Sequence, residues 1–368
     1  MTNAVRVIVL DDGNRGNFNQ ALGIAERLPE ATIETITVPP PSLFHRFVLI
    51  FSANFVDSLP PAILRFLLKR FGQIDCPRQI SREGVEKEHP GPIAIISAGS
   101  KLAPINLILS RYFPAKSIHV LYPDLIRLRL FDLLVTLEPD LWRHPWIAGA
   151  KNLMFIKGAP NRIKPEGPNS MSFPRIVSGN LIRIAVLIGG DDKNYRISEE
   201  WAEELSQRLA EISEKLPARI YLTTSRRTNL KVENIFRKFL GGEPERFNIV
   251  LYWQSFANPV AEFLAAADLI ITTEDSINMV SESASSGKPA VALRVERKNK
   301  KRLVFDQALE NLVAENYIRL WSLQDLVSSN VTEVICNPNR KVLAETEKVA
   351  AKVLELLGND CGIVQVGS

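Results

Sequence analysis

The feature that most constrains this chain is an alternation of short apolar runs with helix-length amphipathic segments, which occurs twice along the sequence. Uninterrupted apolar runs of this length are typical of strands in parallel sheets, which are buried on both faces. The repeated strand–helix alternation predicts an α/β fold with two doubly wound, Rossmann-like parallel-sheet domains. The runs that we expect to form strands are 5–10, 32–38, 93–97, 117–121 and 130–137 in the first half, and 182–189, 219–223, 248–251, 268–272 and 290–293 in the second.

A segment rich in Pro, Gly, Ser and Asn, residues 164–174, separates the two halves and is typical of a linker. The 368 residues also fit two domains better than one. We expect an N-terminal domain at 1–163, a linker at 164–180, a second domain at 181–339 and a C-terminal helix within 340–368. Ligands of doubly wound sheets bind beyond the carboxyl ends of the strands, so a cleft between the two domains is the expected site.

Composition excludes several classes of protein. Hydrophobic residues make up 46% and charged residues 23%, which excludes a disordered chain or a coiled coil. The apolar runs are too short to span a bilayer, and the N-terminus has no signal-peptide pattern, so we expect a cytoplasmic protein. Cys76, Cys336 and Cys361 are too far apart for a disulfide framework, and neither they nor the four histidines have metal-ligand spacing. A net charge of +4 favours small anions or an anionic membrane surface, and we expect no nucleic-acid partner.

The strongest chemical signal is the segment 267–289, where an apolar strand ends in Thr273-Glu-Asp-Ser276 and a helix follows. Asp275 or Ser276 would cap that helix, and the free amides and positive dipole end of its first turn suit a phosphate. Glu282 lies on the same helix face as Asn278 and could accept hydrogen bonds from a ribose diol. The alternative is an ordinary capped helix with a solvated Glu282.

Two more loops of the second half carry groups that suit an anion. Gly189 and Gly190 follow an apolar strand and would let a ligand approach the backbone, with Arg196 near enough to meet a phosphate. The run Thr223-Thr-Ser-Arg-Arg-Thr228 ends the next strand and adds hydroxyls and two cations on the same edge. Ser225 and Arg226 are its candidate binding residues. Trp253 follows a third strand and could stack on a base. For the glycine pair, the alternative is a tight turn with ordinary surface charge.

In the first half, the segment 11–23 follows the opening strand and is similar to a phosphate or sugar loop, although it is neither a P-loop nor G-x-G-x-x-G. Its candidate binding residues are Gly13, Gly16, Asn19 and Gln20. The acidic residue that would hold a ribose after the second strand is replaced by Val38-Pro-Pro-Pro41, which disfavours a nicotinamide dinucleotide.

Residues 41–71 interleave aromatic and aliphatic side chains with Arg46, Arg65, Lys69 and Arg70. A basic amphipathic stretch of this kind can lie on an anionic membrane surface. The alternative is a pair of core helices with a basic outer face.

With these motifs the chain resembles, nearly end to end, the plant mitochondrial-fission (elongated-mitochondria) family and its bacterial relatives. The motifs that carry the resemblance are Asp12 to Gly23, Gly99-Ser-Lys101, Gly158-Ala-Pro-Asn-Arg-Ile163, Gly189-Gly190, Ser225-Arg-Arg227, Asn258-Pro259 and Thr273 to Pro289. The chain departs from the relatives at Tyr122-Pro-Asp124, Leu137-Glu-Pro-Asp140 and Phe305-Asp306, and two of these departures remove a histidine. A mechanism that uses those histidines therefore does not carry over.

The second half of that family is similar in turn to the donor-binding half of GT-B glycosyltransferases. The resemblance implies that the chain binds a nucleotide-diphosphate sugar. The diphosphate would be flanked by Gly189, Gly190, Ser225 and Arg226 and capped by Ser276, and the ribose would bind to Glu282. Thr273 and Asp275 belong to the same turn as Ser276. It also implies that the C-terminal helix packs back toward the first domain. We expect a glycosyltransferase that needs no metal or cofactor and transfers the sugar to a lipid-linked or envelope saccharide at the cytoplasmic membrane face. Asp11, Asp12 and Asp140 are the candidates for its general base.

Two other functions stay open. Plant members of the family act as adaptors on the mitochondrial surface, so the chain could be a non-catalytic membrane-surface adaptor that kept the fold. Bacterial relatives are often labelled nucleoside-diphosphate-sugar epimerases, but an epimerase that holds a dinucleotide would need a fingerprint that is missing here.

Overall fold

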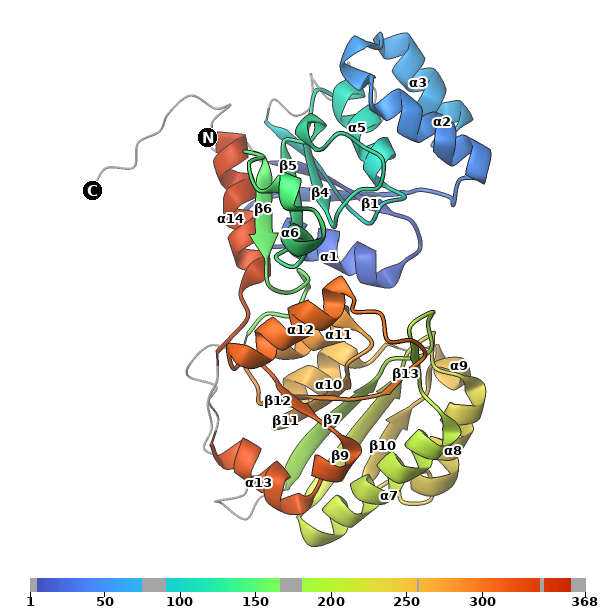
Figure 1. The fold of residues 1–368 in the computed structure, drawn as a ribbon, viewed down its shortest axis with the longest axis vertical. Helices are drawn as coiled ribbons and strands as arrows, with labels where there is room; N and C mark the ends of the chain where they lie inside the picture. The colour runs from blue at the N-terminus through green and yellow to red at the C-terminus, as the bar shows by residue number, and fades with distance from the viewer. Residues whose placement is uncertain (1–4, 75–90, 166–180, 257, 338–340, 359–368) are drawn as a thin grey trace, which may run out of the picture. The chain divides into compact units, whose positions relative to one another are not determined.

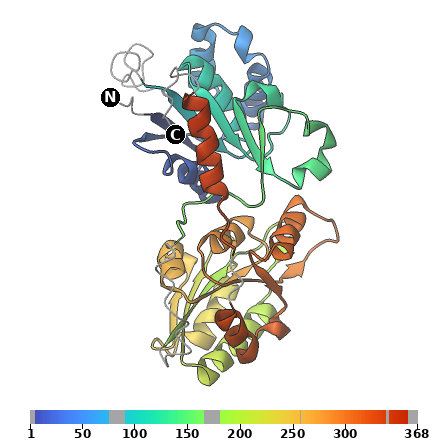
Figure 2. The ribbon, with the colours of Figure 1, turned by 90° about the vertical axis from the view of Figure 1, so that its left-hand side faces the viewer.

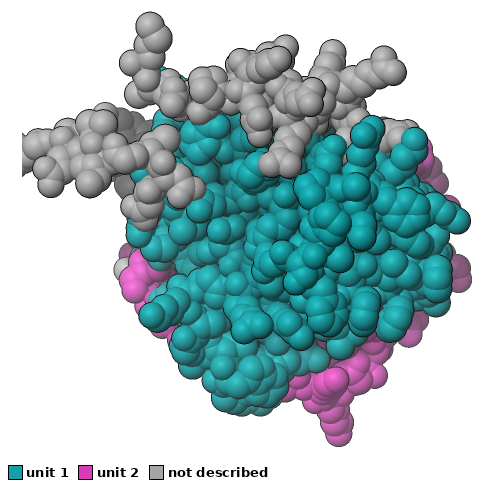
Figure 3. Space-filling model, turned by 90° about the horizontal axis from the view of Figure 1, so that it is seen from above, with its two compact units in different colours: residues 1–162, 344–368 teal, residues 163–343 magenta. Residues whose placement is uncertain are grey.

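The computed structural model describes residues 5–74, 91–165, 181–256, 258–337 and 341–358, and the chain divides into two compact units (Figure 3). Unit 1 comprises residues 1–162 and 344–368, and unit 2 comprises residues 163–343. Most of the predicted linker, 164–180, lies outside the described residues.

Unit 1 is built on a parallel six-stranded sheet in the order β2-β1-β3-β4-β5-β6 (Figure 1). The inner strands are the predicted apolar runs, and their side chains are buried on both faces. The sequence did not predict β6, which has only four residues and is partly exposed at the sheet edge. The strands are β1 Arg6–Asp11, β2 Thr32–Thr37, β3 Ile93–Ala98, β4 Lys116–Val120, β5 Leu133–Leu137 and β6 Leu153–Ile156.

Helices cover this sheet in two layers on one side. The buried helix α5 lies against β3 and β4, and α2 and α3 pack in turn on α5 (Figure 1). The Asn106 side chain in α5 donates to the carbonyl oxygens of Ile95 and Ile118 at 3.0 and 2.9 Å, which fixes the helix to two strands. The helices are α1 Arg15–Ala25, α2 Leu43–Ala53, α3 Pro61–Arg70, α5 Ala103–Tyr112, α6 Asp140–Arg143 and α14 Glu345–Gly358, with 3-10 turns at Val56–Ser58, Leu128–Leu130 and Pro145–Ile147.

The last helix, α14, belongs to unit 1 although it follows unit 2 in the sequence (Figure 2). It packs on α1 with Val349, Val353 and Leu357 buried. The side chain of Arg27, two residues after α1, is only 8% exposed, and its Nε lies 3.1 Å from a carboxylate oxygen of Glu347. The sequence of unit 1 is therefore discontinuous.

Unit 2 holds a second parallel six-stranded sheet, in the order β10-β9-β7-β11-β12-β14. Counted along the chain, this is the Rossmann order 3-2-1-4-5-6. The prediction of two doubly wound parallel sheets is therefore confirmed. The strands are β7 Ile182–Ile188, β9 Ala218–Thr224, β10 Phe247–Val250, β11 Leu269–Thr273, β12 Ala290–Leu293 and β14 Arg319–Trp321, with a separate antiparallel ribbon of β8 Tyr195–Arg196 and β13 Glu296–Arg297.

Two long helices of unit 2, α7 and α8, combine an amphipathic pattern with a side-chain cap at the N-terminus. Ser198 caps α7 by accepting a hydrogen bond from the Trp201 amide, and Asn229 caps α8 through the Lys231 amide. The short edge strand β14 and the helices α12 and α13 were not predicted. The helices are α7 Glu199–Lys215, α8 Leu230–Leu240, α9 Tyr252–Ser255, α10 Val260–Ala266, α11 Ile277–Ser285, α12 Val304–Ala314 and α13 Ser328–Cys336, with a 3-10 turn at Leu323–Asp325.

Candidate functional site

The strand order of unit 2 reverses between β7 and β11, which are neighbours in the sheet. At such a switch point the chains leave the two strands toward opposite faces, and the space between their loops is where doubly wound sheets bind ligands. The turn after β7 contains Gly189 and Gly190, and the turn after β11 runs from Thr273 to Ser276. We call this place the unit 2 switch point.

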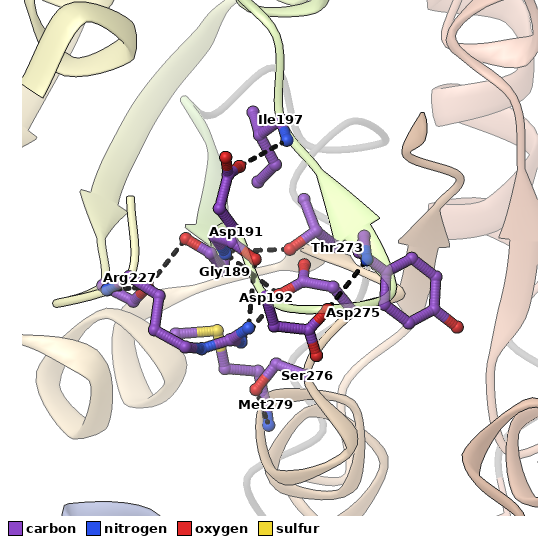
Figure 4. Close-up of polar contacts among 12 residues, drawn as sticks. Gly189, Asp191, Asp192, Ile197, Arg227, Thr273, Asp275, Ser276 and Met279 are labelled. Carbon is purple, nitrogen blue, oxygen red and sulfur yellow. Dashed lines mark hydrogen bonds and ion pairs between the residues drawn. The ribbon is translucent and has the colours of Figure 1, made fainter. Parts of the chain in front are cut away.

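The two turns of the switch point are hydrogen-bonded to each other. The Gly189 amide donates to Thr273 Oγ1 at 2.8 Å, and the Gly190 amide donates to Asp275 Oδ2 at 2.9 Å (Figure 4). A Cβ atom on Gly189 would overlap the Asp275 carboxylate, and one on Gly190 would overlap the Arg227 backbone. The glycines thus permit a close approach by the protein itself. The expectation that they leave the backbone open to a ligand is corrected, because both amides are already bonded.

Asp275 lies at the centre of this arrangement with its side chain fully buried. Its Oδ2 accepts hydrogen bonds from the Gly190 amide and from Arg227 Nη2, the latter at 2.7 Å. Its Oδ1 is also buried and has no hydrogen-bond partner among the described residues. Ser276, not Asp275, caps α11 by accepting a hydrogen bond from the Met279 amide.

The turn after β9 is the third part of the site. Ser225 Oγ donates to the Gly189 carbonyl oxygen at 2.7 Å, and Thr228 Oγ1 donates to the same oxygen. Arg227 Nη1 donates to the Gly190 carbonyl oxygen at 3.0 Å. Arg226, which we named from the sequence, is exposed, whereas the neighbouring Arg227 is the cation that faces the switch point.

The helix α11 starts at this switch point with the dipole polarity that attracts an anion. Arg227 neutralises the buried Asp275 carboxylate and uses only two of its five N–H donors on the contacts described above. Glu282, further along α11, is partly buried, and this burial raises its pKa to about 7. Near neutral pH, Glu282 therefore populates both its acid and its carboxylate form.

An aromatic side chain lies beside the third loop. Trp253 Nε1 donates to the Thr228 carbonyl oxygen at 2.9 Å, and the Trp253 side chain is 45% exposed. The Trp253 amide donates to the buried Glu233 carboxylate at 3.3 Å. The Trp253 side chain is therefore held in place by hydrogen bonds while the residue stays partly exposed. Arg196 lies elsewhere, exposed in the β8–β13 ribbon, and no described contact joins it to the switch point.

The β8–β13 ribbon contains a cluster that the sequence marked only as a departure. Tyr195 Oη and Arg297 Nη1 donate to Asp306 Oδ1 at 2.5 and 2.7 Å, and the Leu303 amide donates to Asp306 Oδ2 at 2.7 Å. Burial opposes ionisation of Asp306, but these hydrogen bonds prevail and lower its pKa. Burial and Asp306 together raise the pKa of Tyr195. The aspartate thus fastens the ribbon to the start of α12.

Unit 1 has a switch point of its own between β1 and β3, where its strand order reverses. Asp11 Oδ1 accepts a hydrogen bond from the Gly13 amide at 2.8 Å, and Asp12 Oδ1 accepts one from the Asn14 amide at 3.1 Å. Gly13 has a φ of +77°, which explains the glycine. Asp11 and Asp12, two of the three predicted catalytic carboxylates, therefore stabilise the loop in which they lie. Of the other loop residues named from the sequence, Gly16 and Asn19 are partly buried in α1 and Gln20 is buried.

Asp140 lies apart from that loop, after β5 and at the start of the four-residue helix α6. It is buried, it accepts a hydrogen bond from Thr136 Oγ1, and burial raises its pKa. His144, one helical turn later, stacks on Tyr122 with ring centroids 4.2 Å apart. A carboxylate with a raised pKa is better matched to general-base work near neutral pH than an ordinary one.

No group of three or more His, Cys, Asp or Glu in the described parts of the chain could hold a metal ion. The groups at the unit 2 switch point that could hold a ligand are a helix N-terminus, the remaining donors of Arg227, the unpartnered Asp275 Oδ1 and the Trp253 ring. Arg227 and Thr228 belong to the run 223–228 that the sequence indicated, but only Ser225 and Arg226 were named from it as binding residues.

Comparison with known proteins agrees with this architecture. The family model described as "Mitochondrial fission ELM1" matches residues 15–357. The Rickettsia prowazekii protein RP120 is 26% identical over 382 residues, which cover 95% of this chain and 99% of that protein.

Among solved structures, a putative UDP-N-acetylglucosamine 2-epimerase from Listeria monocytogenes is similar with a TM-score of 0.55, 13% identity and coverage of 99% and 98% of the two chains. The glycosyltransferase SnogD from Streptomyces nogalater is similar with a TM-score of 0.51, 13% identity and coverage of 97% and 100%. At these identities the likeness establishes the fold, which is that of the GT-B glycosyltransferases and related epimerases.

Proposed function

The chain belongs to the mitochondrial fission ELM1 family, and from that premise and the GT-B fold we propose that it binds a nucleotide-diphosphate sugar at the unit 2 switch point and transfers the sugar. The observation that carries the proposal is the convergence of three loops on this point. They bring the α11 N-terminus, Arg227 and an unpartnered buried oxygen of Asp275 to the place where this fold binds ligands. The similar structure named as an epimerase acts, by its name, on a UDP-sugar.

Each part of the donor has a partner in this proposal. The diphosphate lies at the first turn of α11, where backbone amides, the helix dipole and the free donors of Arg227 stabilise its charge. The Glu282 carboxylate accepts hydrogen bonds from the ribose hydroxyls, and the base stacks on the ring of the partly exposed Trp253. The buried Asp275 Oδ1 accepts a hydrogen bond from a donor group of the ligand. Arg196 is left out of this arrangement because of its position in the ribbon.

The acceptor would bind on unit 1, and its chemistry is that of a lipid-linked or envelope saccharide. An inverting transfer needs a base for the acceptor hydroxyl, and we assign this role to Asp140, because its pKa is raised and neither it nor its helix shapes the β1 loop. Asp11 and Asp12 instead accept hydrogen bonds from their own loop. Arg227 and the helix dipole can stabilise the leaving diphosphate as its charge develops.

Calorimetric titration of the full chain with UDP and a set of nucleotide sugars tests the donor site. Removing the ribose acceptor in Glu282→Ala should weaken binding by about 10- to 150-fold, because hydrogen bonds to a charged group contribute roughly 1.5–3 kcal/mol. Glu199→Ala is the control, since Glu199 is exposed in α7 and its ion pair with Lys231, at 3.7 Å, is a weak surface contact. Equal affinities for wild type and Glu282→Ala would refute the assignment.

The same titration, together with NMR of the sugar, separates transfer from the two other functions. If the wild-type chain binds no nucleotide at millimolar concentration, the adaptor function is favoured. The Gly189 and Gly190 amides would agree with that result, because both donate to acceptors within the protein. A chain that converts a UDP-sugar without any acceptor would be an epimerase, which the fold similarity favours as the second candidate. NMR of the sugar anomeric proton distinguishes conversion from transfer.

A further inference from the structure

We infer that the outer face of α2 and α3 docks on an anionic lipid bilayer. The inference rests on unit 1 alone and is independent of the donor site proposed above. The first observation is the exposure of large apolar side chains along α2, where Leu43 is 87%, Phe44 67% and Phe47 68% exposed. Phe51 and Phe55 continue the same side of the chain and are also exposed.

A surface helix usually buries its largest apolar side chains, and α2 does the opposite. In α2 the buried residues are Leu49 and Ala53, whereas the larger aromatic side chains face solvent. The helix α3 buries Leu64, Leu67 and Leu68 and exposes Ile63 and Phe66. The alternative of a core pair with a basic outer face is therefore wrong, because the outer face is apolar as well as basic. The ring of Phe71, directly after α3, contacts the rings of Phe44 and Phe66 with centroids 6.4 and 6.0 Å apart, so the apolar side chains of the two helices are continuous. A contiguous apolar patch on a surface marks an interaction site.

A second segment brings a further apolar side chain to the patch. The Asn54 side chain, directly after α2, donates to the Leu125 carbonyl oxygen at 2.9 Å and accepts from the Arg127 amide at 2.9 Å. Leu125 is 81% exposed, and the Arg127 guanidinium lies over the Phe55 ring at 5.3 Å. The loop 124–127 is thus held at the C-terminal end of α2, and we call the whole surface the α2–α3 patch.

Charge selects an anionic bilayer as the occupant. The sequences of α2 and α3 contain Arg46, Arg65, Lys69 and Arg70 and no acidic residue. Arg65, Lys69 and Arg70 are exposed. Of the acidic residues near the patch, Asp57, between the helices, is engaged by Arg111 at 2.7 Å, and Asp124, in the loop 124–127, lies 3.9 Å from Arg46. Aromatic residues flanked by exposed cations match the boundary between acyl chains and anionic headgroups.

The lengths of α2 and α3 determine how the patch binds to the bilayer. The helix α2 has 11 residues and α3 has 10, about half of what a span needs. No helix in the described ranges is long and apolar enough to cross a membrane. The patch therefore lies in the plane of the interface, with its phenylalanines inserted and Arg65 and Arg70 at the headgroups.

Vesicle co-sedimentation of the full chain without nucleotide tests this inference. Wild type should bind vesicles of equal parts phosphatidylcholine and phosphatidylglycerol, bind phosphatidylcholine vesicles far less, and dissociate as salt rises. Phe44→Ser with Phe47→Ser should lower the partition coefficient by at least about tenfold, because each ring withdraws a large apolar area from water. Arg65→Gln with Arg70→Gln should lower it by about fivefold per charge on anionic vesicles only.

Phe239→Ser is the matched control, since Phe239 is exposed on α8 of unit 2, and it should bind vesicles like wild type. Melting temperatures of all variants should stay near that of wild type, because the substituted side chains are exposed. No binding of wild type to anionic vesicles, or equal loss in Phe239→Ser, would overturn the inference. A wild-type dimer that Phe44→Ser with Phe47→Ser converts to monomers, without vesicle binding, would instead make the patch an interface between copies.

Discussion

Glu282 is the residue whose titration bears most directly on the donor site, because its pKa is raised to about 7 by burial. Only the ionised carboxylate can accept hydrogen bonds from both ribose hydroxyls. Affinity should therefore rise with pH through this value, with a dissociation constant about tenfold lower one unit above it than one unit below. Calorimetry with a UDP-sugar, whose phosphates do not titrate in this range, measures the slope. Glu282→Gln should abolish it, and a slope that survives in Glu282→Gln would assign the titration to another group.

His119 in β4 gives a second titration, of stability. It is fully buried against Ser97, with Nδ1 2.8 Å from the Ser97 Oγ, and burial lowers its pKa from 6.5 to about 3. Below pH 6.5 the unfolded chain takes up a proton that the folded chain refuses, so stability falls as pH falls. The loss should reach about 2 kcal/mol by pH 5, since each pH unit contributes 1.36 kcal/mol.

Denaturant midpoints measured between pH 7 and pH 5 check this prediction for His119. His119→Gln replaces the imidazole with a side chain that does not titrate. The free energy of unfolding of this variant should therefore fall by about 2 kcal/mol less than that of wild type between pH 7 and pH 5. Buried carboxyls such as Asp140 titrate with the opposite sign and remain in both proteins, so the difference between the two curves isolates His119. Parallel curves would show that His119 does not control acid stability.

The same residue scale shows where sequence reasoning succeeds and where it stops. The Thr273–Ser276 turn, the helix that follows it and the Ser225 loop were predicted, because strand ends and capping residues have local signatures. The contacts of Arg227 with Gly190 and Asp275 were not predictable, because consecutive residues of a loop point in directions that only the fold determines. The role of Gly189 was also misjudged, because the group that approaches it, Asp275, lies 86 positions away.

At the scale of elements, the turn after β7 depends on Gly190. A Cβ atom there would overlap the Arg227 backbone, which cannot move without releasing Asp275 and the β9 turn. Gly190→Ala should therefore destabilise unit 2 by about 2 kcal/mol or more and weaken nucleotide binding. Gly242→Ala is the control, since nothing lies within 4 Å of a Cβ at that position. A Gly190→Ala protein with wild-type melting temperature and affinity would contradict the described packing.

The attachment of the β8–β13 ribbon to α12 depends on Asp306. Asp306→Ala removes the acceptor for Tyr195 and Arg297 and the cap of the Leu303 amide, so a loss of about 1–3 kcal/mol is expected. Glu310→Ala on the same helix removes a more exposed pair with Arg302 and should change stability by less than about 1 kcal/mol. Thermal unfolding of the two variants compares the effects, and equal losses would leave Asp306 no special role.

The elements also show which parts of a fold a single sequence hides. The inner strands β5 and β7 were predictable because each is a largely apolar run. The edge strands β6 and β14 were not, because they have four and three residues and are partly exposed. Their place in the sheet comes from pairing with β5 and β12 rather than from a pattern of their own.

At the scale of the whole molecule, unit 1 needs a helix that lies at the far end of the chain. Truncation after Leu343 removes α14, exposing the Arg27 side chain and the face of α1 that Val349, Val353 and Leu357 cover. Unit 1 should lose several kcal/mol of stability, whereas the melting of unit 2 should change little. Amide hydrogen exchange resolves the units separately. Unchanged protection of β1 and α1 in the truncated chain would show that α14 contributes little.

This discontinuity also sets an order for events during synthesis. The ribosome completes residues 163–343 before it makes α14, so unit 2 has its whole sequence available while unit 1 still lacks its last helix. Until that helix arrives, the apolar surface of α1 that it covers stays accessible to chaperones and to neighbouring nascent chains. A premature stop late in the reading frame would therefore damage the beginning of the protein more than its middle.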